Sequence, residues 1–464
     1  MNADLLILGA GPAGLAAATT ARAHGLSVIC LDDQPAPGGQ IWRGIELVGA
    51  TARGATLGAS YRKGLPVVVA FRACGAHYEA ATQLWQIEPD LDAGGYTAFV
   101  SRDGQARTLG ARTVLLAPGA QERPAPFPGW TLPGVMTVGA AQILLKSSGQ
   151  IPAEPVFIAG CGPLALLYAT QLLASGGQIA GFLDTAPPGQ WRAALRSMPR
   201  MLAAAPDILN GLRWMLALRR ARVPMLHGVT AIAATGSDRL ETLSYRTAAG
   251  TQHTVPATLM LVHEGVVPNI HAALSRGCAM HWVERQDCFA PELDEWGETT
   301  RPGIFVAGDA AGIGGAQAAA LRGRIAALGI AAKYFGRSTA AEAVSLRRQR
   351  DRVLALRPFL DAAFRPRPEV FTPADDVVVC RCEEVTAGQI RRTAQTGCPG
   401  PNQIKAFTRA GMGACQGRQC GYTVTRLLAE ASGRPPADIG FYRIRPPLKP
   451  VTIGELANLE PEFS

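Results

Sequence analysis

The amino-acid sequence predicts an α/β protein with two βαβ domains followed by a small helical domain. A strand, a glycine turn and a helix follow one another near the N-terminus, and the same pattern returns near residue 155. Four of the ten cysteines then form two close pairs in the C-terminal part of the chain. At 464 residues the chain exceeds the roughly 250–300 residues that one core usually supports, so several domains are expected.

The first glycine turn has the spacing of a dinucleotide-binding motif. An expected strand, Asp4–Leu8, runs directly into Gly9-Ala10-Gly11-Pro12-Ala13-Gly14, and an alanine-rich helix covers Leu15–His24. In this motif the first glycine makes a tight turn, the second leaves room for a pyrophosphate, and the third lets the helix pack closely on the strand. The phosphates then bind at the positive end of the helix.

A carboxylate stands where the ribose of such a nucleotide would lie. The next expected strand, Ser27–Leu31, ends at Asp32 and Asp33, about 20 residues after the turn. Asp32 directly follows the apolar run, so it is the preferred acceptor for the ribose hydroxyls. The combination of strand, turn, helix and acid is much more specific than the glycines alone.

The second motif repeats this arrangement with small differences. Its expected strand, Pro155–Ala159, precedes Gly160-Cys161-Gly162-Pro163-Leu164-Ala165, and the following strand, Gln178–Leu183, ends at Asp184. Ala165 still permits close helix packing, and Asp184 disfavours a 2′-phosphate, so NAD or an adenine nucleotide fits better than NADP. Two interpretations of this second site remain open. It is either a working nicotinamide site, or a structural relic or a site that holds only an adenine nucleotide.

Residues 1–330 resemble the flavoprotein family with two Rossmann-like dinucleotide-binding domains that includes the thioredoxin and glutathione reductases. The resemblance rests on two crossover segments, Ala117-Pro118-Gly119-Ala120 and 265–269, and on the Gly308-Asp309 pair after a late strand. It implies FAD in the first domain, with Asp309 accepting from the ribityl hydroxyls and a helix beginning near Gly314. The further cofactor-binding residues that it implies are Pro12, Ala13, Asp33, Gly38, Gly39, Gln40, Ala117, Gly119 and Gly308. No CxxC follows Gly39 or occurs in the second domain, which speaks against disulfide reductase activity.

The four clustered cysteines are candidate metal ligands. They are Cys380, Cys382, Cys415 and Cys420. Four thiolates indicate zinc or an iron–sulfur cluster. The CxC and CxxxxC spacing resembles the bacterioferritin-associated-ferredoxin-like (BFD-like) domain, which implies a [2Fe-2S] cluster. We expect three short helices around it, at Ala387–Gln395, Asn402–Arg409 and Tyr422–Ala431.

The whole chain resembles the larger flavin and iron–sulfur subunit of the opine oxidase, hydrogen cyanide synthase and D-hydroxyproline or L-proline dehydrogenase family. The segment Phe127–Val135, the cysteine spacing and the Arg-Pro-Pro tail complete the resemblance. It implies an electron-transferring subunit without catalytic residues of its own. A D-amino-acid-oxidase-like flavoprotein subunit would oxidise a C–N bond, with FMN between the subunits in some members and a small ferredoxin-like subunit in others. A stand-alone NAD(P)H-dependent flavin oxidoreductase and a non-enzymatic metal-binding or sensor protein are the alternatives.

These observations predict the domain organisation. We expect an FAD domain (1–120 and 270–330), a second nucleotide-binding domain (121–269), a linker (331–373), the BFD-like domain (374–432) and a C-terminal strap (433–464).

Composition excludes other classes of function. The net charge is +9, but only five of the 45 basic residues are lysines and the arginines are scattered, so no nucleic-acid partner is expected. No apolar run reaches the roughly 18 residues of a membrane span, which predicts a cytoplasmic protein without one. The locally basic stretches Trp191–Arg222 and Leu346–Arg367 are interpreted as solvated helix faces or a docking surface. His263, Glu264 and His281 are interpreted as structural residues.

Overall fold

The first domain is built on a seven-stranded sheet. The computed structural model describes residues 2–92, 94–190 and 205–459. The strands lie in the order β3-β2-β1-β6-β5-β4, with β19 paired to β6. Strand β6 is long enough to pair in parallel with β1 through Leu116 and antiparallel with β5 through its first half. The strands are β1 (Asn2–Leu8), β2 (Val28–Leu31), β3 (His77–Glu79), β4 (Gln83–Asp90), β5 (Gly95–Arg102), β6 (Gln105–Leu116) and β19 (Ile304–Val306).

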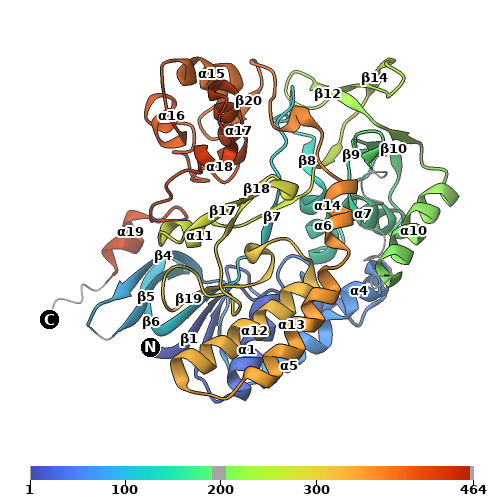
Figure 1. The fold of residues 1–464 in the computed structure, drawn as a ribbon. Coiled ribbons are helices and arrows are strands. Elements are labelled where there is room, and N and C mark those ends of the chain that lie inside the picture. The colour runs from blue at the N-terminus through green and yellow to red at the C-terminus, as the bar shows by residue number, and fades with distance from the viewer. Residues whose placement is uncertain (1, 93, 191–204, 460–464) are drawn as a thin grey trace.

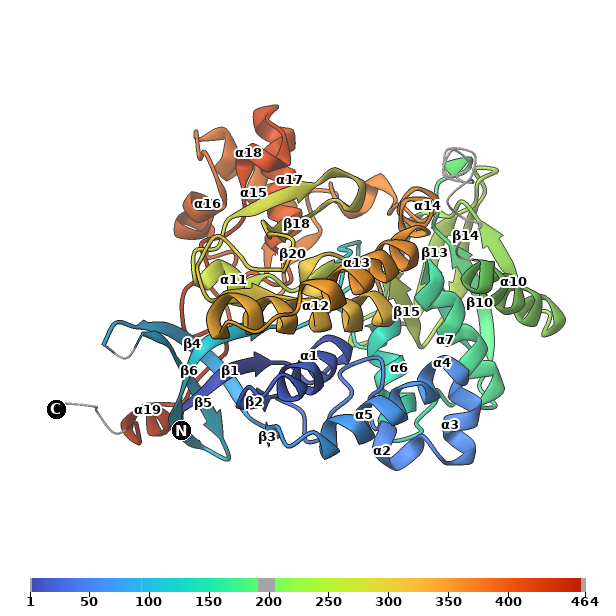
Figure 2. The same ribbon diagram turned by 60° about the horizontal axis from the view of Figure 1, so that its bottom comes forward.

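Helix α1 (Pro12–Ala23) and helix α12 (Ala316–Phe335) pack together beside this sheet (Figures 1 and 2). A side chain at Gly323 of α12 would place its Cβ atom 2.1 Å from the carbonyl oxygen of Ala13, so only glycine allows the two helices to approach this closely. The close contact of these two helices brings the start of α1 next to the segment that precedes α12. The neighbouring helices are α2 (Ile45–Val48), α3 (Ala52–Leu57), α4 (Ala59–Arg62) and α5 (Gly64–Ala73).

The second domain has a parallel sheet of five strands in the order β11-β10-β9-β15-β8. They are β8 (Val135–Thr137), β9 (Val156–Gly160), β10 (Ile179–Asp184), β11 (Met225–His227) and β15 (Met260–His263), with helices α6 (Val138–Ser147), α7 (Pro163–Ala174) and α10 (Ala205–Arg220). An antiparallel sheet of β12 (Thr230–Thr235), β13 (Thr242–Arg246) and β14 (Gln252–Pro256) completes the domain. The first part of the basic stretch Trp191–Arg222 lies outside the described residues.

Two crossover strands join the domains, and a hairpin follows them. The crossover strands are β7 (Ala120–Glu122) and β16 (Val266–Pro268), which pair antiparallel. Helix α11 (His271–Ser275) follows β16. The hairpin then consists of β17 (Met280–Val283) and β18 (Cys288–Pro291), with η3 (Glu284–Gln286) between them. The two crossovers are those expected from the sequence.

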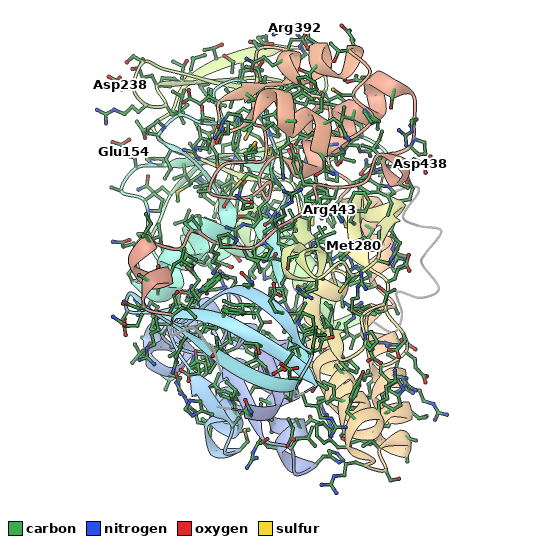
Figure 3. All side chains as sticks on the ribbon, turned by 90° about the vertical axis from the view of Figure 1, so that its left-hand side faces the viewer. Glu154, Asp238, Met280, Arg392, Asp438 and Arg443 are labelled. Atoms are coloured by element: carbon green, nitrogen blue, oxygen red, sulfur yellow. The ribbon has the colours of Figure 1, made fainter. Side chains whose placement is uncertain are left out.

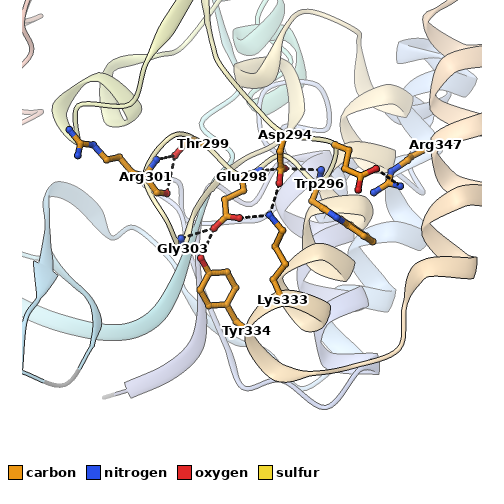
Figure 4. A network of polar contacts seen from close by, with 10 residues as sticks. Asp294, Trp296, Glu298, Thr299, Arg301, Gly303, Lys333, Tyr334 and Arg347 are labelled. Carbon is orange, nitrogen blue, oxygen red and sulfur yellow. Dashed lines mark hydrogen bonds and ion pairs between the residues drawn. The ribbon is translucent and has the colours of Figure 1, made fainter.

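A polar network fixes the segment that leads into β19 and the 3-10 helix η4 (Gly308–Ala311) (Figure 4). The Nζ atom of Lys333 on α12 lies 2.5 Å from carboxylate oxygens of both Asp294 and Glu298, and the Tyr334 hydroxyl donates to Glu298. Glu298 also accepts from the backbone N–H of Gly303. The neighbouring Lys333 holds the pKa of Asp294 below its usual value, although burial opposes it. The loop before η4 is therefore anchored to α12.

The C-terminal part begins with helices α13 (Ala340–Leu354) and α14 (Arg357–Ala363) and the short η5 (Pro368–Val370). The cysteine domain follows with β20 (Val378–Cys380), β21 (Val385–Thr386), α15 (Ala387–Gln395), α16 (Pro401–Thr408) and α17 (Gly421–Ser432), and the chain continues through α18 (Pro436–Ile439) and α19 (Ile453–Ala457). The expected helix at Ala387–Gln395 has these bounds, and the other two agree within about a residue at each end.

One buried carboxylate ties three parts of the chain together. Asp287, in the turn of the β17–β18 hairpin, is 1% exposed. It accepts hydrogen bonds from Arg365, at 3.1 Å from Nε, and from Arg426 of α17. The hairpin, the segment after α14 and the cysteine domain therefore share one ion-pair centre.

The segment after α18 returns to the first sheet. In Figure 3, Asp438 marks α18 and Arg443 marks the segment that follows it, below the cysteine domain. Leu448 donates its backbone N–H to Trp85 O at 2.8 Å, and Lys449 Nζ lies 2.5 Å from the Asp33 carboxylate. The C-terminal segment thus packs against its own flavin-type domain.

The observed architecture confirms the predicted α/β class with two nucleotide-binding domains and a small helical domain. Among the helices that the structure describes, none is both long and apolar enough to cross a bilayer.

Candidate functional site

The first glycine turn is shaped to receive a phosphate group. Gly9 has φ +102°, and a Cβ atom there would lie 2.4 Å from Ala117 O. A Cβ atom on Gly14 would lie 1.9 Å from Gly9 O, so the turn and α1 tolerate no side chain at these positions. Gly11 is the N-cap of α1, with Pro12 at the first helical position, and the atom nearest to its Cβ position is the Gly39 Cα atom. The geometry fits the pyrophosphate of FAD at the N-terminus of α1.

The loop after Asp33 lies over this turn, as the resemblance implies. Gly38 donates its N–H to Ala10 O at 2.8 Å, and a Cβ atom on Gly39 would lie 2.8 Å from Gly11 Cα. Gly38 itself has φ +128°, in the region that favours glycine. The two glycines therefore allow the loop to approach the phosphate site.

Sequence reasoning missed a buried lysine beneath this loop. Lys146 of α6 is 3% exposed, and its Nζ atom donates to Gln40 O at 3.1 Å and to the Gln142 side chain at 2.8 Å. Burial, with repulsion from Arg43, lowers the pKa of Lys146 to about 7. The signal in the sequence is a single charged residue in a mostly apolar helix. Lys146 links the second domain to the loop that contains Gln40.

The two acids at the end of β2 differ in accessibility. Asp32 is buried, and its two carboxylate oxygens accept from the N–H groups of Ala10, at 2.6 Å, and Gln34, at 2.9 Å. Burial raises the pKa of Asp32 to about 6 against these hydrogen bonds. The Asp33 side chain is 46% exposed and pairs with Lys449. Asp32 thus stabilises the glycine turn, while Asp33 is the more accessible carboxylate.

The Gly308-Asp309 pair lies beside the start of α1. A Cβ atom on Gly308 would lie 3.0 Å from Ala13 Cβ, and one oxygen of Asp309 accepts from the N–H groups of Gly314 and Gly315 at 2.9 Å. Helix α12 begins directly after these residues, close to the start expected from the sequence. Nearby, the N–H of Ala117 bonds to Leu8 O, and Gly119 with φ +72° accepts from Asn269. The structure therefore places the predicted FAD-binding residues in one region.

The second glycine turn has a different surrounding. Gly160 would place a Cβ atom 2.0 Å from His263 O, so it packs tightly, whereas the atom nearest to a Cβ position on Gly162 is Phe364 Cβ at 3.9 Å. Asp184 accepts from the N–H of Ala186 and lies 2.8 Å from His227 Nδ1. The turn is well formed, but the segment after α14 lies beside it.

The four cysteines of the C-terminal domain lie as two pairs. The thiol of Cys380 is hydrogen-bonded to Cys420, and Cys415 to Cys382. In the ranges that the structure describes, no three His, Cys, Asp or Glu side chains converge to hold a single metal ion. Because Cys420 interacts with both Cys380 and Cys415, the four thiols lie close together and would suit the four cysteine ligands of a two-iron cluster.

Backbone N–H groups surround the sulfur of Cys380. The hydrogen bond with Cys420, together with N–H groups of Gly411, Glu383 and Cys382, lowers the pKa of Cys380 to about 6, although burial opposes this shift. Such donors stabilise negative charge on the sulfur of a thiolate ligand. The residues present thus fit an anionic iron–sulfur cluster.

Tyr442 completes the cysteine site from outside the domain predicted for it. It is 1% exposed, and Cβ atoms on Gly411 and Gly417 would each lie 2.6 Å from its ring. Its hydroxyl lies 4.0 Å from Cys420 Sγ. These two glycines make room for the tyrosine ring, a contact that sequence spacing did not reveal.

The segment from Cys415 to Cys420, here called the cysteine loop, contacts the crossover strand β7 and the helix α11. Gln121 Nε2 of β7 donates to Arg418 O at 2.8 Å, and His271 Nε2 lies 3.2 Å from Gln416 O. Burial, with repulsion from Arg418, lowers the pKa of His271 to about 4, so its ring is neutral near pH 7 and donates one N–H. The cysteines therefore stand next to the segment that follows Ala117 and Gly119.

Two family models match different parts of the chain. Residues 3–323 match the family model of the pyridine nucleotide-disulphide oxidoreductases, and residues 378–430 match the BFD-like [2Fe-2S] binding domain. The A-subunit of opine oxidase from Agrobacterium tumefaciens is 45% identical over 98% of this chain and 92% of its own. The chain belongs to the same family of opine oxidase subunits.

One further relative and one solved structure also match nearly the whole chain. Hydrogen cyanide synthase subunit HcnB of Pseudomonas aeruginosa is 33% identical over all of both chains. The crystal structure of L-proline dehydrogenase from P. horikoshii has a TM-score of 0.72 at 20% identity, over 98% of this chain and 80% of that one, and shows a shared fold. The predicted FAD-dependent oxidoreductase fold and the predicted [2Fe-2S] domain are thus confirmed.

Proposed function

We propose that this chain is the electron-transferring flavin and iron–sulfur subunit of a heteromeric amino-acid dehydrogenase. The single observation that carries the proposal is the contact of the cysteine loop with strand β7 and with His271 of α11, directly beside the FAD-type domain. When bound, FAD supplies two-electron chemistry and the cluster supplies one-electron steps. The relatives named above are subunits of oxidases and of a cyanide synthase, which supports a partner subunit.

The chain's own residues would hold both cofactors. Gly9, Gly11 and Gly14 would bind the FAD pyrophosphate, Asp32 or Asp33 the adenosine ribose, and Asp309 the ribityl chain. Asp32 and Asp33 both already have protein partners at each oxygen, and Asp33 differs in being the more exposed of the two. The four clustered cysteines would ligate the irons.

The partner would be a D-amino-acid-oxidase-like flavoprotein that oxidises the C–N bond of an opine, proline or hydroxyproline. FMN at the subunit interface and a small ferredoxin-like subunit are further parts of this proposal. A cytoplasmic location fits the ten cysteines, all of which lie in described ranges and are free thiols.

Helix α10 is the proposed partner surface. Its exposed apolar side chains Leu209, Leu212, Met215 and Leu216 lie among arginines of the same helix. Such a patch is typical of a protein–protein contact. The C-terminal segment serves a different purpose, because it packs against its own first sheet.

Co-expression with the oxidase-like partner tests the proposal. The complex should reduce an artificial dye with an opine, proline or hydroxyproline as donor, whereas the chain alone should not. A Leu212→Asp and Leu216→Asp variant should lose co-purification, with Leu91→Asp as the control, since Leu91 is 89% exposed in the turn after β4. Comparable turnover by the lone chain would contradict the proposed division of labour.

A further inference from the structure

The segment between α14 and η5 crosses the carboxyl ends of three strands in the second sheet. Cys161, directly after β9, donates its thiol to Phe364 O at 3.5 Å. Glu264, directly after β15, pairs with Arg367 Nε at 3.0 Å. Gln190, six residues after the end of β10, accepts from the N–H of Arg365 at 3.2 Å. Open α/β sheets bind their ligands at this edge, so the segment occupies the place of a ligand.

The segment after α14 lies next to Gly162, the second glycine of the motif. The nearest atom to a Cβ position on Gly162 is Phe364 Cβ, at 3.9 Å. At the corresponding Gly11 of the first motif the nearest atom is Gly39 Cα, at 3.8 Å, which carries no side chain. A dinucleotide pyrophosphate needs the open face of this glycine. At the second motif, Phe364 lies against this face of Gly162.

The contact is part of the protein core. The Arg367 and Glu264 side chains are 4% and 0% exposed. Val370, three residues further, is 1% exposed and belongs to the same hydrophobic cluster as Leu183 and Val262 of the second domain. Displacing the segment would therefore uncover an ion pair and an apolar side chain together.

The ribose position is also engaged. The one Asp184 oxygen that does not bond to the Ala186 N–H lies 2.8 Å from His227 Nδ1. The carboxylate expected to receive the ribose hydroxyls of NAD thus has a protein partner at each oxygen, as Asp32 has in the first motif, so the difference between the two sites lies in residues 364–367.

We propose that residues 364–367 act as an internal peptide ligand that fills the second dinucleotide site and excludes NAD(H) and NADP(H). The second domain then serves as a scaffold that carries the segment leading to the cysteine domain. Electrons cannot reach the flavin from a nicotinamide bound at this site. This inference does not depend on the identity of the partner subunit or of the amino-acid substrate.

Nucleotide binding to the FAD-loaded full chain tests the inference. Equilibrium dialysis with NADH should detect no binding up to 1 mM, and anaerobic NADH should leave the flavin absorbance unchanged. The Phe364→Gly, Arg367→Ala double variant should bind NADH at least tenfold more tightly than the wild type. Arg348→Ala, on the exposed face of α13, is the matched control and should bind none.

A second readout does not depend on nucleotide affinity. The thiol of Cys161 is 3% exposed, so iodoacetamide labelling followed by peptide mass spectrometry should leave it unmodified in the wild type and modify it in the double variant. NADH binding to the wild-type chain below 1 mM would overturn the inference. So would a double variant that exposes Cys161 yet binds NADH no better than wild type.

Discussion

Replacing Arg367 by methionine should destabilise the chain far more than replacing an exposed arginine. The guanidinium lies 3.0 Å from the Glu264 carboxylate, and both side chains are almost fully buried. Removing one partner of a buried ion pair leaves an uncompensated charge, at a cost of about 3–5 kcal/mol. Arg348→Met, on the exposed face of α13, should cost less than about 0.5 kcal/mol.

The pH dependence adds a sharper criterion. Burial raises the pKa of Glu264, while Arg367 opposes the rise. A carboxyl whose pKa is raised in the folded state stabilises the fold at low pH, and this contribution is lost as the pH rises through the folded pKa. Without Arg367 the pKa should rise further, so the variant's deficit should be smaller at pH 5 than at pH 8.

Urea unfolding followed by tryptophan fluorescence measures both effects. The Arg367→Met, Glu264→Leu double variant should recover most of the lost stability, because a buried ion pair is often replaceable by apolar groups of similar volume. An Arg367→Met deficit no larger than that of Arg348→Met, or one that grows toward pH 5, would refute the reasoning.

Three further predictions concern the cofactor sites and the buried lysine. Cys382→Ser should abolish the one-electron paramagnetic resonance signal after dithionite while FAD stays bound at wild-type stoichiometry, and a surviving rhombic signal would place the ligands elsewhere. Gly14→Ala should reduce FAD content at least tenfold, because its Cβ atom would lie 1.9 Å from Gly9 O, whereas Gly211→Ala, with open space around it, should retain FAD. Lys146→Met should raise the Tm at pH 6 by at least about 2 °C, because burial makes the ammonium costly and lowers its pKa to about 7. The gain should shrink as the pH rises from 7 toward 10, because the unfolded chain then also begins to lose the lysine proton that the folded chain lacks. A gain that is equal at both pH values would show that the lysine is not destabilising through its charge.

The local motifs could be predicted from the sequence because their signals are short in range. The strand, turn and helix around Gly9 and Gly160 follow from glycine spacing and apolar runs, and the helix at Ala387–Gln395 is one of the three short helices expected around the clustered cysteines. The capping box at Thr386 and Gln389 gives that helix a defined start. Prediction and structure agree at these elements because each is determined by residues that lie within about twenty positions of one another in the chain.

The contacts between distant segments could not be predicted in this way. Cys161 and Phe364 are 203 residues apart, and nothing in the composition of the linker indicates that it covers a glycine turn. The role of Asp32 also depends on distance in space, since the Ala10 N–H that it accepts lies 22 residues earlier. Sequence spacing identifies a possible ribose ligand, but only the fold shows which carboxylate remains accessible.

The shared ion-pair centre at Asp287 has a kinetic consequence. Arg365 and Arg426 hold the cysteine domain and its preceding segment to one hairpin of the flavin-type domain. A domain fixed in this way does not diffuse on a tether between docking positions. Electron passage within the chain should therefore keep the same rate when glycerol or sucrose thickens the solvent, unlike that of redox proteins whose carrier domain must swing.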